Sequence, residues 1–463
     1  MTDRADNNIP GAPGPLSRII QAIGVQPVRR LSNLFVPARP LPSNSSAGSC
    51  ASVRDKHPAA PPSVLFVDHT GELGGAELCL LDLARTYSGR HKVLLFQDGP
   101  LRERLADAGV NVEVIEAGRH LLSVRRASGL RNLWKAIPTI AGLARRIARE
   151  ARDFDIVYAN SQKAFICSVL AAGLARRPLV WHLHDILTGS GFSQTLKSAA
   201  VHLANRGASL VIVNSVATAD AFAAAGGRTD HTAIVYNGID PRPYLHAQPS
   251  PRPRLPDGSA PPLVGIFGRL AAWKGQHVLI DALAELDGVH ALIVGDSLFG
   301  EVAYADELKQ RIEAHGLQDR VHFLGFRQDV APLMKSVDVV VHASTAPEPF
   351  GRVIAEAMMA GRPVVAAANG GALELIQEGV TGFLVKADNP AALAEKLRGV
   401  LADPVGAAEI AGQGNKAAVR AFTLSAVTKE IEALLARVGR PHPTGAPHRG
   451  TKRVGFNPDE INP

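Results

Sequence analysis

The chain has 463 residues, 46% of them hydrophobic and 20% charged, so it is long enough to bury two ordinary hydrophobic cores. Its three cysteines (Cys50, Cys79 and Cys167) are odd in number and lack metal-ligand spacing. They argue against a disulfide framework and a structural zinc site, and they favour a reducing, cytoplasmic setting. The formal charge of +7 lies mostly in residues 1–62 and 439–463, without interleaved aromatic residues, so we expect no nucleic-acid partner.

Both ends of the chain lack hydrophobic periodicity. Residues 1–62 are rich in Pro, Ser, Ala and Arg, and residues 439–463 in Pro, Gly and basic residues, so we predict a disordered basic tail at each end. Residues 16–36 mix apolar residues with arginines, which leaves two interpretations: a segment lying on an anionic membrane, or a plain flexible tail. The start lacks a charged-then-apolar signal pattern, and the longest apolar run, 164–175, is too short to span a bilayer.

From residue 63 onward, short β-rich runs alternate with helical patterns, as is typical of parallel α/β sheets. The first series of predicted strands comprises residues 64–69, 92–97, 112–117, 155–160, 178–184, 209–214 and 233–237. A Pro-rich stretch, residues 241–262, predicts a linker. The second series comprises residues 263–268, 290–295, 321–325, 339–344, 363–368 and 382–385. We therefore predict an α/β protein with two Rossmann-like domains, residues 63–240 and 263–422.

Within the first domain, residues 69–77 form a glycine-rich loop, HTGELGGAE, between a strand and a helix. Gly74 and Gly75 would let the backbone approach a ligand at the helix N-terminus. The loop lacks the G-x-G-x-x-G spacing of a dinucleotide site, although Asp98 weakly imitates the ribose acid, so an NAD-dependent enzyme stays an alternative. His184 ends a later strand, where its side chain would face a cleft, and His182 is its rival on the same face.

Within the second domain, Arg269 follows the first predicted strand, and Lys274 lies five residues later at a helix entrance. A guanidinium fork with an ammonium point charge suits a diphosphate. The alternative is two exposed cations on a loop.

Residues 347–363, PEPFGRVIAEAMMAGRP, carry two carboxylates around a Phe-Gly turn. Two prolines hold Glu348 on an extended loop. Gly351 begins an apolar-periodic run that predicts a helix, and Glu356 lies about one turn inside it. The free backbone N–H groups and the dipole at the helix N-terminus are suited to bind a phosphate. The segment therefore predicts a sugar-nucleotide site, and the alternative is a capped surface helix with two solvated acids.

The stretches 347–363 and 265–283 resemble signatures of the retaining, nucleotide-sugar-dependent glycosyltransferases of family 4 (group 1). The resemblance implies the GT-B fold, in which two Rossmann-like domains face each other across a cleft. The first domain would hold the acceptor and the second the donor, while a C-terminal helix, here residues 423–438, would cross back to the first domain. No metal ion and no cofactor besides the nucleoside diphosphate sugar is implied.

The resemblance also implies roles for particular residues. Catalysis would fall to Arg269, Lys274, Glu348 and His184, and donor binding to Gly74, Gly75, Glu356, Phe350, Gly351, Arg327 and Gly295. In this assignment Glu356 accepts hydrogen bonds from the ribose, and Glu348 from the transferred sugar. Phe350 and Gly351 act through their backbone amides, and residues 237–240 support domain closure as a hinge.

The implied function is transfer of a hexosyl group to a saccharide or lipid-linked acceptor, in cell-surface polysaccharide or glycolipid synthesis. A catalytically inactive sugar-nucleotide-binding or scaffold protein is the alternative. Residues 119–152 are rich in arginine with interspersed leucines. They predict either a peripheral contact with an anionic membrane, at the inner face of the cytoplasmic membrane, or a solvated helix.

Overall fold

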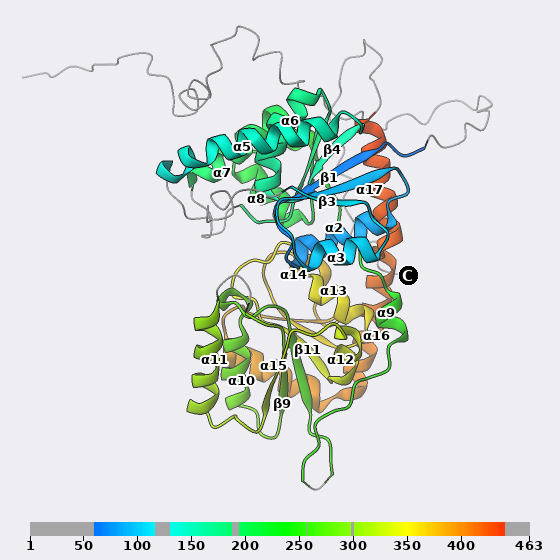
Figure 1. The fold of residues 1–463 in the computed structure, drawn as a ribbon. Helices are drawn as coiled ribbons and strands as arrows, with labels where there is room; N and C mark the ends of the chain where they lie inside the picture. The colour runs from blue at the N-terminus through cyan, green and yellow to red at the C-terminus, as the bar shows by residue number, and fades with distance from the viewer. Residues whose placement is uncertain (1–59, 116–129, 188–193, 257, 298–300, 440–463) are drawn as a thin grey trace, which may run out of the picture.

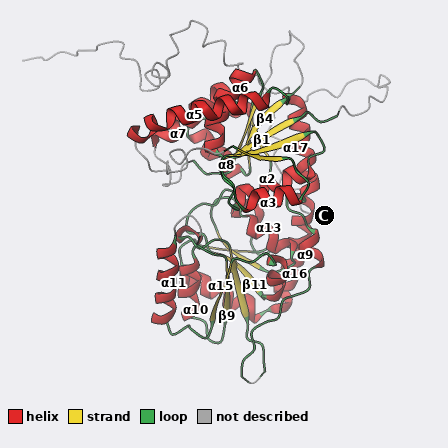
Figure 2. Cartoon of the chain, viewed as in Figure 1, coloured by secondary structure: helices red, strands yellow, loops and turns green. Residues whose placement is uncertain are grey.

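The computed structural model describes residues 60–115, 130–187, 194–256, 258–297 and 301–439. The predicted tails fall almost wholly outside these residues, as do parts of the arginine-rich region. Within them the chain forms two parallel β-sheets, each covered by helices on both faces (Figures 1 and 2). The prediction of two Rossmann-like domains in a GT-B arrangement is confirmed.

The first sheet has the strand order β3-β2-β1-β4-β5-β6-β7, and all its neighbouring strands pair in parallel. Its strands are β1 (Val64–Asp68), β2 (His91–Leu95), β3 (Val112–Val114), β4 (Ile156–Ala159), β5 (Leu179–Leu183), β6 (Leu210–Val213) and β7 (Thr232–Ile234). The helices that accompany it are α2 (Gly75–Thr86), α3 (Pro100–Asp107), α5 (Leu130–Ala151), α6 (Gln162–Ala175), α7 (Gln194–Gly207) and α8 (Val216–Ala224). Each of the seven runs predicted as strands contains or overlaps one of these strands.

The second sheet has the order β10-β9-β8-β11-β12-β13, again parallel throughout. Its strands are β8 (Leu263–Phe267), β9 (His290–Val294), β10 (Val321–Gly325), β11 (Val339–His342), β12 (Val364–Ala367) and β13 (Phe383–Val385). Its helices are α10 (Gln276–Ala284), α11 (Val302–Ala314), α12 (Val330–Ser336), α13 (Arg352–Met359), α14 (Ala372–Leu375), α15 (Pro390–Ala402) and α16 (Pro404–Ala421).

Burial on both faces explains why the strands are nearly continuous apolar runs. Every residue of β1, β5, β8 and β11 is buried. In the first domain the Trp181 ring stacks on Phe165, with 4.3 Å between ring centroids, and meets the edge of Phe222. These aromatic contacts join β5 to α6 and α8 and hold the strand ends that carry the polar residues of the site.

Two segments connect the domains. The Pro-rich stretch 241–262 contains a short helix, α9 (Arg242–His246), which packs on α12 and α13 through the buried Tyr244. Helix α17 (Leu424–Val438) runs back along the first domain, where Val427, Ile431 and Leu435 join its hydrophobic core. Figure 1 shows α17 beside α2, reached from α16. None of the helices in the described ranges is long and apolar enough to cross a membrane.

A third connection crosses the cleft through Glu374 on α14. Its carboxylate accepts hydrogen bonds from the backbone amides of Val216 and Ala217, each at 2.8 Å, at the start of α8 in the first domain. The Tyr236 hydroxyl also donates to it, at 3.1 Å. A carboxylate at a helix N-terminus is favoured by the helix dipole as well as by the hydrogen bonds. The two domains are therefore joined on the cleft side as well as by the chain.

We expect Glu374→Ala to lower the free energy of unfolding by about 1 to 2 kcal/mol, because it removes charge-assisted hydrogen bonds at a partly exposed site. The exposed Glu409 on α16 gives the control, and Glu409→Ala should change stability by less than about 0.5 kcal/mol. Urea unfolding of the three proteins measures both values. Equal stability of the two variants would contradict a stabilising role for the Glu374 contact.

Candidate active site

The parallel sheets place polar residues at the carboxyl ends of the strands where the strand order reverses, which is where open α/β sheets bind ligands. In the second sheet that point lies between β8 and β11. Arg269 follows β8, and Lys274 ends a short 3-10 turn before α10. The Trp273 ring lies against both cations, 5.5 Å from the Arg269 guanidinium carbon and 4.4 Å from Lys274 Nζ. The structure thus brings the two predicted cations to the same ring.

Gly275 fixes how closely this turn approaches β11. Its φ is 73°, a left-handed conformation, and a Cβ there would lie 1.9 Å from the carbonyl oxygen of Ala343. A larger residue would push the turn away from the strand. The glycine therefore allows the turn to bring Lys274 close to the loop that carries Glu348.

Glu348 is buried, and both of its oxygens have partners. Lys274 Nζ donates to Oε1 at 2.6 Å, Ser344 Oγ donates to Oε2 at 2.9 Å, and His342 Nε2 also bonds Oε2. Burial alone would raise the pKa of Glu348, but the Lys274 ammonium and the His342 ring lower it well below its usual value. The carboxylate is therefore held ionised, and His342 carries its proton on Nε2 because the carboxylate can only accept.

Glu356 lies inside α13 and is also buried. Burial raises its pKa, and the Arg352 guanidinium, whose Nε donates to Glu356 Oε1 at 2.7 Å, opposes that shift. The Tyr244 hydroxyl also hydrogen-bonds this carboxylate. Gly351 is the N-cap of the helix. The Phe350 ring is buried in the core, which leaves its backbone as the part available to a ligand.

The two weaker donor-binding candidates lie at neighbouring strand ends. Gly295 follows β9 with φ 143°, and a Cβ there would lie 2.0 Å from the Gly268 carbonyl oxygen, so a glycine is needed for the two loops to touch. Arg327 follows β10, where its exposed guanidinium bonds Asp329 at 2.7 and 2.8 Å. Their contacts with a nucleotide remain predictions.

In the first sheet the order reverses between β1 and β4, and His184 lies nearby at the end of β5. Asn160, just past β4, donates through Nδ2 to Asp68 Oδ2 at 2.6 Å and to the Ala76 carbonyl at 3.1 Å. Two acceptors fix that end of the amide as the NH₂ group, so its Oδ1 faces His184 Nε2 at 3.0 Å. Nε2 must then be the protonated nitrogen, and the buried Nδ1, which has no hydrogen-bond partner, is an acceptor.

His184 is kept neutral by its surroundings. Burial lowers its pKa to about 4, and the nearby Asp185 and Asp68 only partly oppose this. The His182 ring packs against it, with 3.8 Å between centroids, and burial also holds the pKa of His182 well below its usual value. His182, whose Nδ1 bonds the Tyr158 hydroxyl at 2.8 Å, is a structural partner of His184. His184 is thus a neutral imidazole whose buried Nδ1 has no hydrogen-bond partner among the described residues.

The glycine loop lies beside this network. Gly74 is the N-cap of α2, and Gly75 is exposed at its first position. Asp68, His69 and Glu77 bring ligand atoms within 4.8 Å of one another, the only such group among the described residues. However, His69 Nδ1 bonds Asp68 and Ser161, and burial with the Asp68 charge raises the pKa of Glu77 to about 8. Within the protein, Glu77 therefore carries its proton at neutral pH, and Asp68 and Ser161 hold the His69 ring in place.

Sequence reasoning missed several polar residues of the site. His342 and Ser344 lie two positions apart at the end of β11, and Asn160 follows β4, so a search for polar residues at the carboxyl ends of apolar strands could have found them. Tyr244 lies inside the Pro-rich stretch that was predicted to be a linker, so no site role was expected for it. No sequence signal joins Arg352 to the first domain.

Two Rossmann-like domains with a cationic and carboxylate site at the strand-order reversal define a GT-B glycosyltransferase. The sequence profile "Glycosyl transferases group 1" matches residues 250–417, and the profile "Glycosyltransferase Family 4" matches residues 73–242. The chain belongs to this glycosyltransferase family, and it is a glycosyltransferase.

The chain is similar to several named proteins. The chain is 44% identical to HepE (Alr3699) of Anabaena, solved with UDP and glucose; the match covers 81% of this chain and 99% of that one, with a TM-score of 0.73. It is 29% identical to a phosphatidyl-myo-inositol mannosyltransferase of Mycobacterium leprae over 77% of this chain and 91% of the relative. It is 32% identical to the lipopolysaccharide core biosynthesis glycosyltransferase LpsE of Rhizobium meliloti over 40% of this chain, and that match spans about half, 53%, of the relative.

The depressed pKa of His184 predicts a pH-dependent stability. In the unfolded chain His184 takes up a proton as the pH falls through about 6.5, whereas in the folded protein it does so only near pH 4. Between these pH values the unfolded state binds more protons, so the free energy of unfolding falls as the pH falls. We expect this loss to be smaller in His184→Gln, which has no proton to gain. Urea unfolding at several pH values in this window measures it; a constant difference between the two proteins would contradict the assignment.

Proposed function

We propose that the protein transfers a hexosyl group from UDP-glucose or a related UDP-sugar to a saccharide or lipid-linked acceptor, with retention of configuration. The observation that carries the proposal is the largely shielded Lys274–Glu348 pair beside Arg269 at the β8/β11 reversal. It offers cations for a diphosphate next to an ionised acceptor for sugar hydroxyls. The choice of uridine is supported by the relative HepE, whose solved structures contain UDP, glucose and UDP-glucose.

The proposed chemistry needs charge stabilisation rather than a protein nucleophile. The bond between the sugar C1 and the diphosphate oxygen breaks, and the electron pair leaves with UDP. The acceptor hydroxyl oxygen bonds to C1 on the same face, and its proton passes to the leaving phosphate. Arg269 and Lys274 would stabilise the growing phosphate charge, while Glu348 and the His184 Nδ1 would hold the sugar. This account needs no metal, so activity should survive EDTA.

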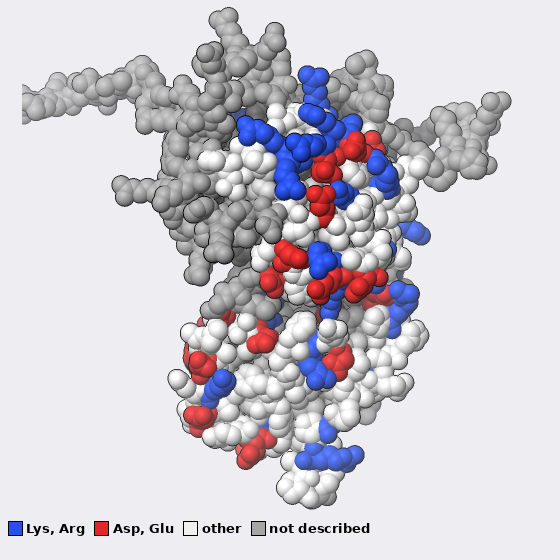
Figure 3. All heavy atoms as spheres, viewed as in Figure 1, with Lys and Arg blue, Asp and Glu red and all other residues white. Residues whose placement is uncertain are grey.

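The acceptor proposal rests on the named relatives, one a lipopolysaccharide core enzyme and another a phosphatidyl-myo-inositol mannosyltransferase. A membrane-borne acceptor would be reached from a basic face of the first domain. Arg145 and Arg149 are exposed on α5, whose opposite face is buried through Leu143 and Ile147. Figure 3 shows Lys and Arg side chains gathered over the first domain on the face in view. We propose a peripheral contact with anionic lipid there, made by charge.

We expect Lys274→Ala to lower the rate of UDP-glucose turnover by about 100-fold or more, because a buried cation at the leaving group acts mainly in the transition state. Release of UDP, with and without added acceptor and EDTA, measures this. The exposed Lys309 on α11 gives the matched control, and Lys309→Ala should keep wild-type turnover. Unchanged turnover in Lys274→Ala would refute its role, and no UDP release or binding by the wild type would refute the proposed donor.

The membrane contact predicts a loss of vesicle binding in Arg145→Ala/Arg149→Ala. Each arginine near an anionic surface contributes about 1 kcal/mol, so partitioning onto phosphatidylglycerol vesicles should fall by roughly 10-fold or more. Co-sedimentation measures it. Lys416 and Arg420 on α16 are exposed with the same spacing in the second domain, so Lys416→Ala/Arg420→Ala is the control. Equal binding by both variants would contradict a contact through α5.

A further inference from the structure

Arg352, the first residue of α13, spans the two domains. Its Nε donates to Glu356 Oε1 at 2.7 Å in the second domain, and its Nη2 donates to Asp82 Oδ2 at 2.7 Å on α2 of the first. Its Nη1 lies 3.8 Å from the sulfur of Cys79. The Arg352 side chain is 16% exposed and its two carboxylate partners 10% and 11% exposed, so these contacts are largely shielded from water. A guanidinium can make such a two-sided contact because its donors have a fixed fork geometry.

Glu356 depends on this contact for its orientation. Arg352 takes one side of the carboxylate, and the Tyr244 hydroxyl also bonds it. A carboxylate has about four acceptor positions, so two remain for a pair of neighbouring hydroxyl groups. Arg352 therefore leaves Glu356 able to bind a diol while it restricts how the carboxylate can turn.

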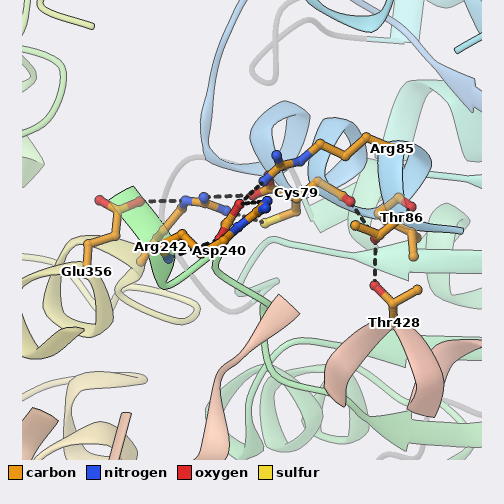
Figure 4. Close-up of polar contacts among 10 residues, drawn as sticks. Cys79, Arg85, Thr86, Asp240, Arg242, Glu356 and Thr428 are labelled. Atoms are coloured by element: carbon orange, nitrogen blue, oxygen red, sulfur yellow. Dashed lines mark hydrogen bonds and ion pairs between the residues drawn. The ribbon is translucent and has the colours of Figure 1, made fainter. Parts of the chain in front are cut away.

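The first-domain end of the contact is itself anchored. Asp82 Oδ1 accepts from Arg85 Nε and Nη2 at 3.1 and 2.8 Å, and Arg85 reaches Asp240 of the connecting segment at 3.4 Å. One residue further along α2, the Thr86 hydroxyl bonds that of Thr428 on α17 at 2.8 Å. Figure 4 shows Arg85 and Asp240 in this group of contacts, with Glu356 at one end and the pair Thr86 and Thr428 at the other. The position of Asp82 is thus fixed by α2, the connecting segment and α17 together.

We propose that Arg352 is a positioning residue through which Asp82 of the first domain orients Glu356 for the ribose hydroxyls of the donor. The ribose site is then complete only when α2 of the first domain lies against α13. This inference rests on the proposed UDP-sugar donor and on the sequence-based expectation that Glu356 accepts hydrogen bonds from its ribose. It differs from a general effect on domain packing because it acts on the hydroxyl groups of the ribose alone.

The test compares UDP with 2′,3′-dideoxy-UDP by calorimetry on the full chain. Wild-type protein should bind UDP about 10-fold more tightly than the dideoxy nucleotide, because Glu356 accepts from the two hydroxyls. In Asp82→Asn the UDP affinity should fall by about 10-fold, while the affinity for dideoxy-UDP changes by less than about twofold. Arg352→Lys keeps the buried charge but cannot reach both carboxylates, so it should show the same pattern.

The control is Arg242→Gln. Arg242 pairs with Asp240 at the outer end of the same chain of charges, and its side chain is 77% exposed, so its removal should leave both affinities unchanged. If the two variants, Asp82→Asn and Arg352→Lys, lose affinity equally for both nucleotides, or lose none, the inference is overturned while the proposed function stands. A wild-type protein that binds no UDP would overturn the proposed donor and this inference with it.

Discussion

The site is organised by the need to keep a buried carboxylate charged. Glu348 stays ionised because Lys274, His342 and Ser344 surround it, and each partner comes from the end of β11 or from the turn after β8. Those two strands are neighbours across the reversal of strand order. Without the Lys274 ammonium, the desolvation of Glu348 would favour its protonated form. The close approach of the Gly275 turn to Ala343 and the pairing of β8 with β11 bring these partners to Glu348.

The first domain uses the opposite solution at its own reversal. There burial keeps His184 and His182 as neutral imidazoles, and burial together with the Asp68 charge keeps Glu77 protonated at neutral pH. These neutral groups lie beside Asp68, whose pKa is lowered despite its burial by hydrogen bonds from His69 and Asn160.

Much of the fold could be predicted from the sequence because parallel strands buried on both faces are continuous apolar runs, and the structure places a strand in every run predicted as one. The local features of the candidate site in the second domain could also be predicted, since Glu348, Gly351 and Glu356 lie within a short stretch whose turn and helix signals are strong. The contacts between distant segments could not be predicted in this way. Asn160 meets His184, and Arg352 meets Asp82, only once the chain has folded. Helix α9 was not predicted because it is short and because the prolines around it suggested a linker.

The contact of Glu374 with α8 has a consequence for how the cleft behaves in different solutions. It pairs a carboxylate with two backbone amides at a partly exposed position, so water can replace each partner when the domains separate. The attraction between the carboxylate and the helix dipole is screened by salt, whereas the apolar packing of α17 on the first domain is not. Raising the ionic strength should therefore weaken the contact between Glu374 and α8 while leaving the packing of α17 on the first domain intact.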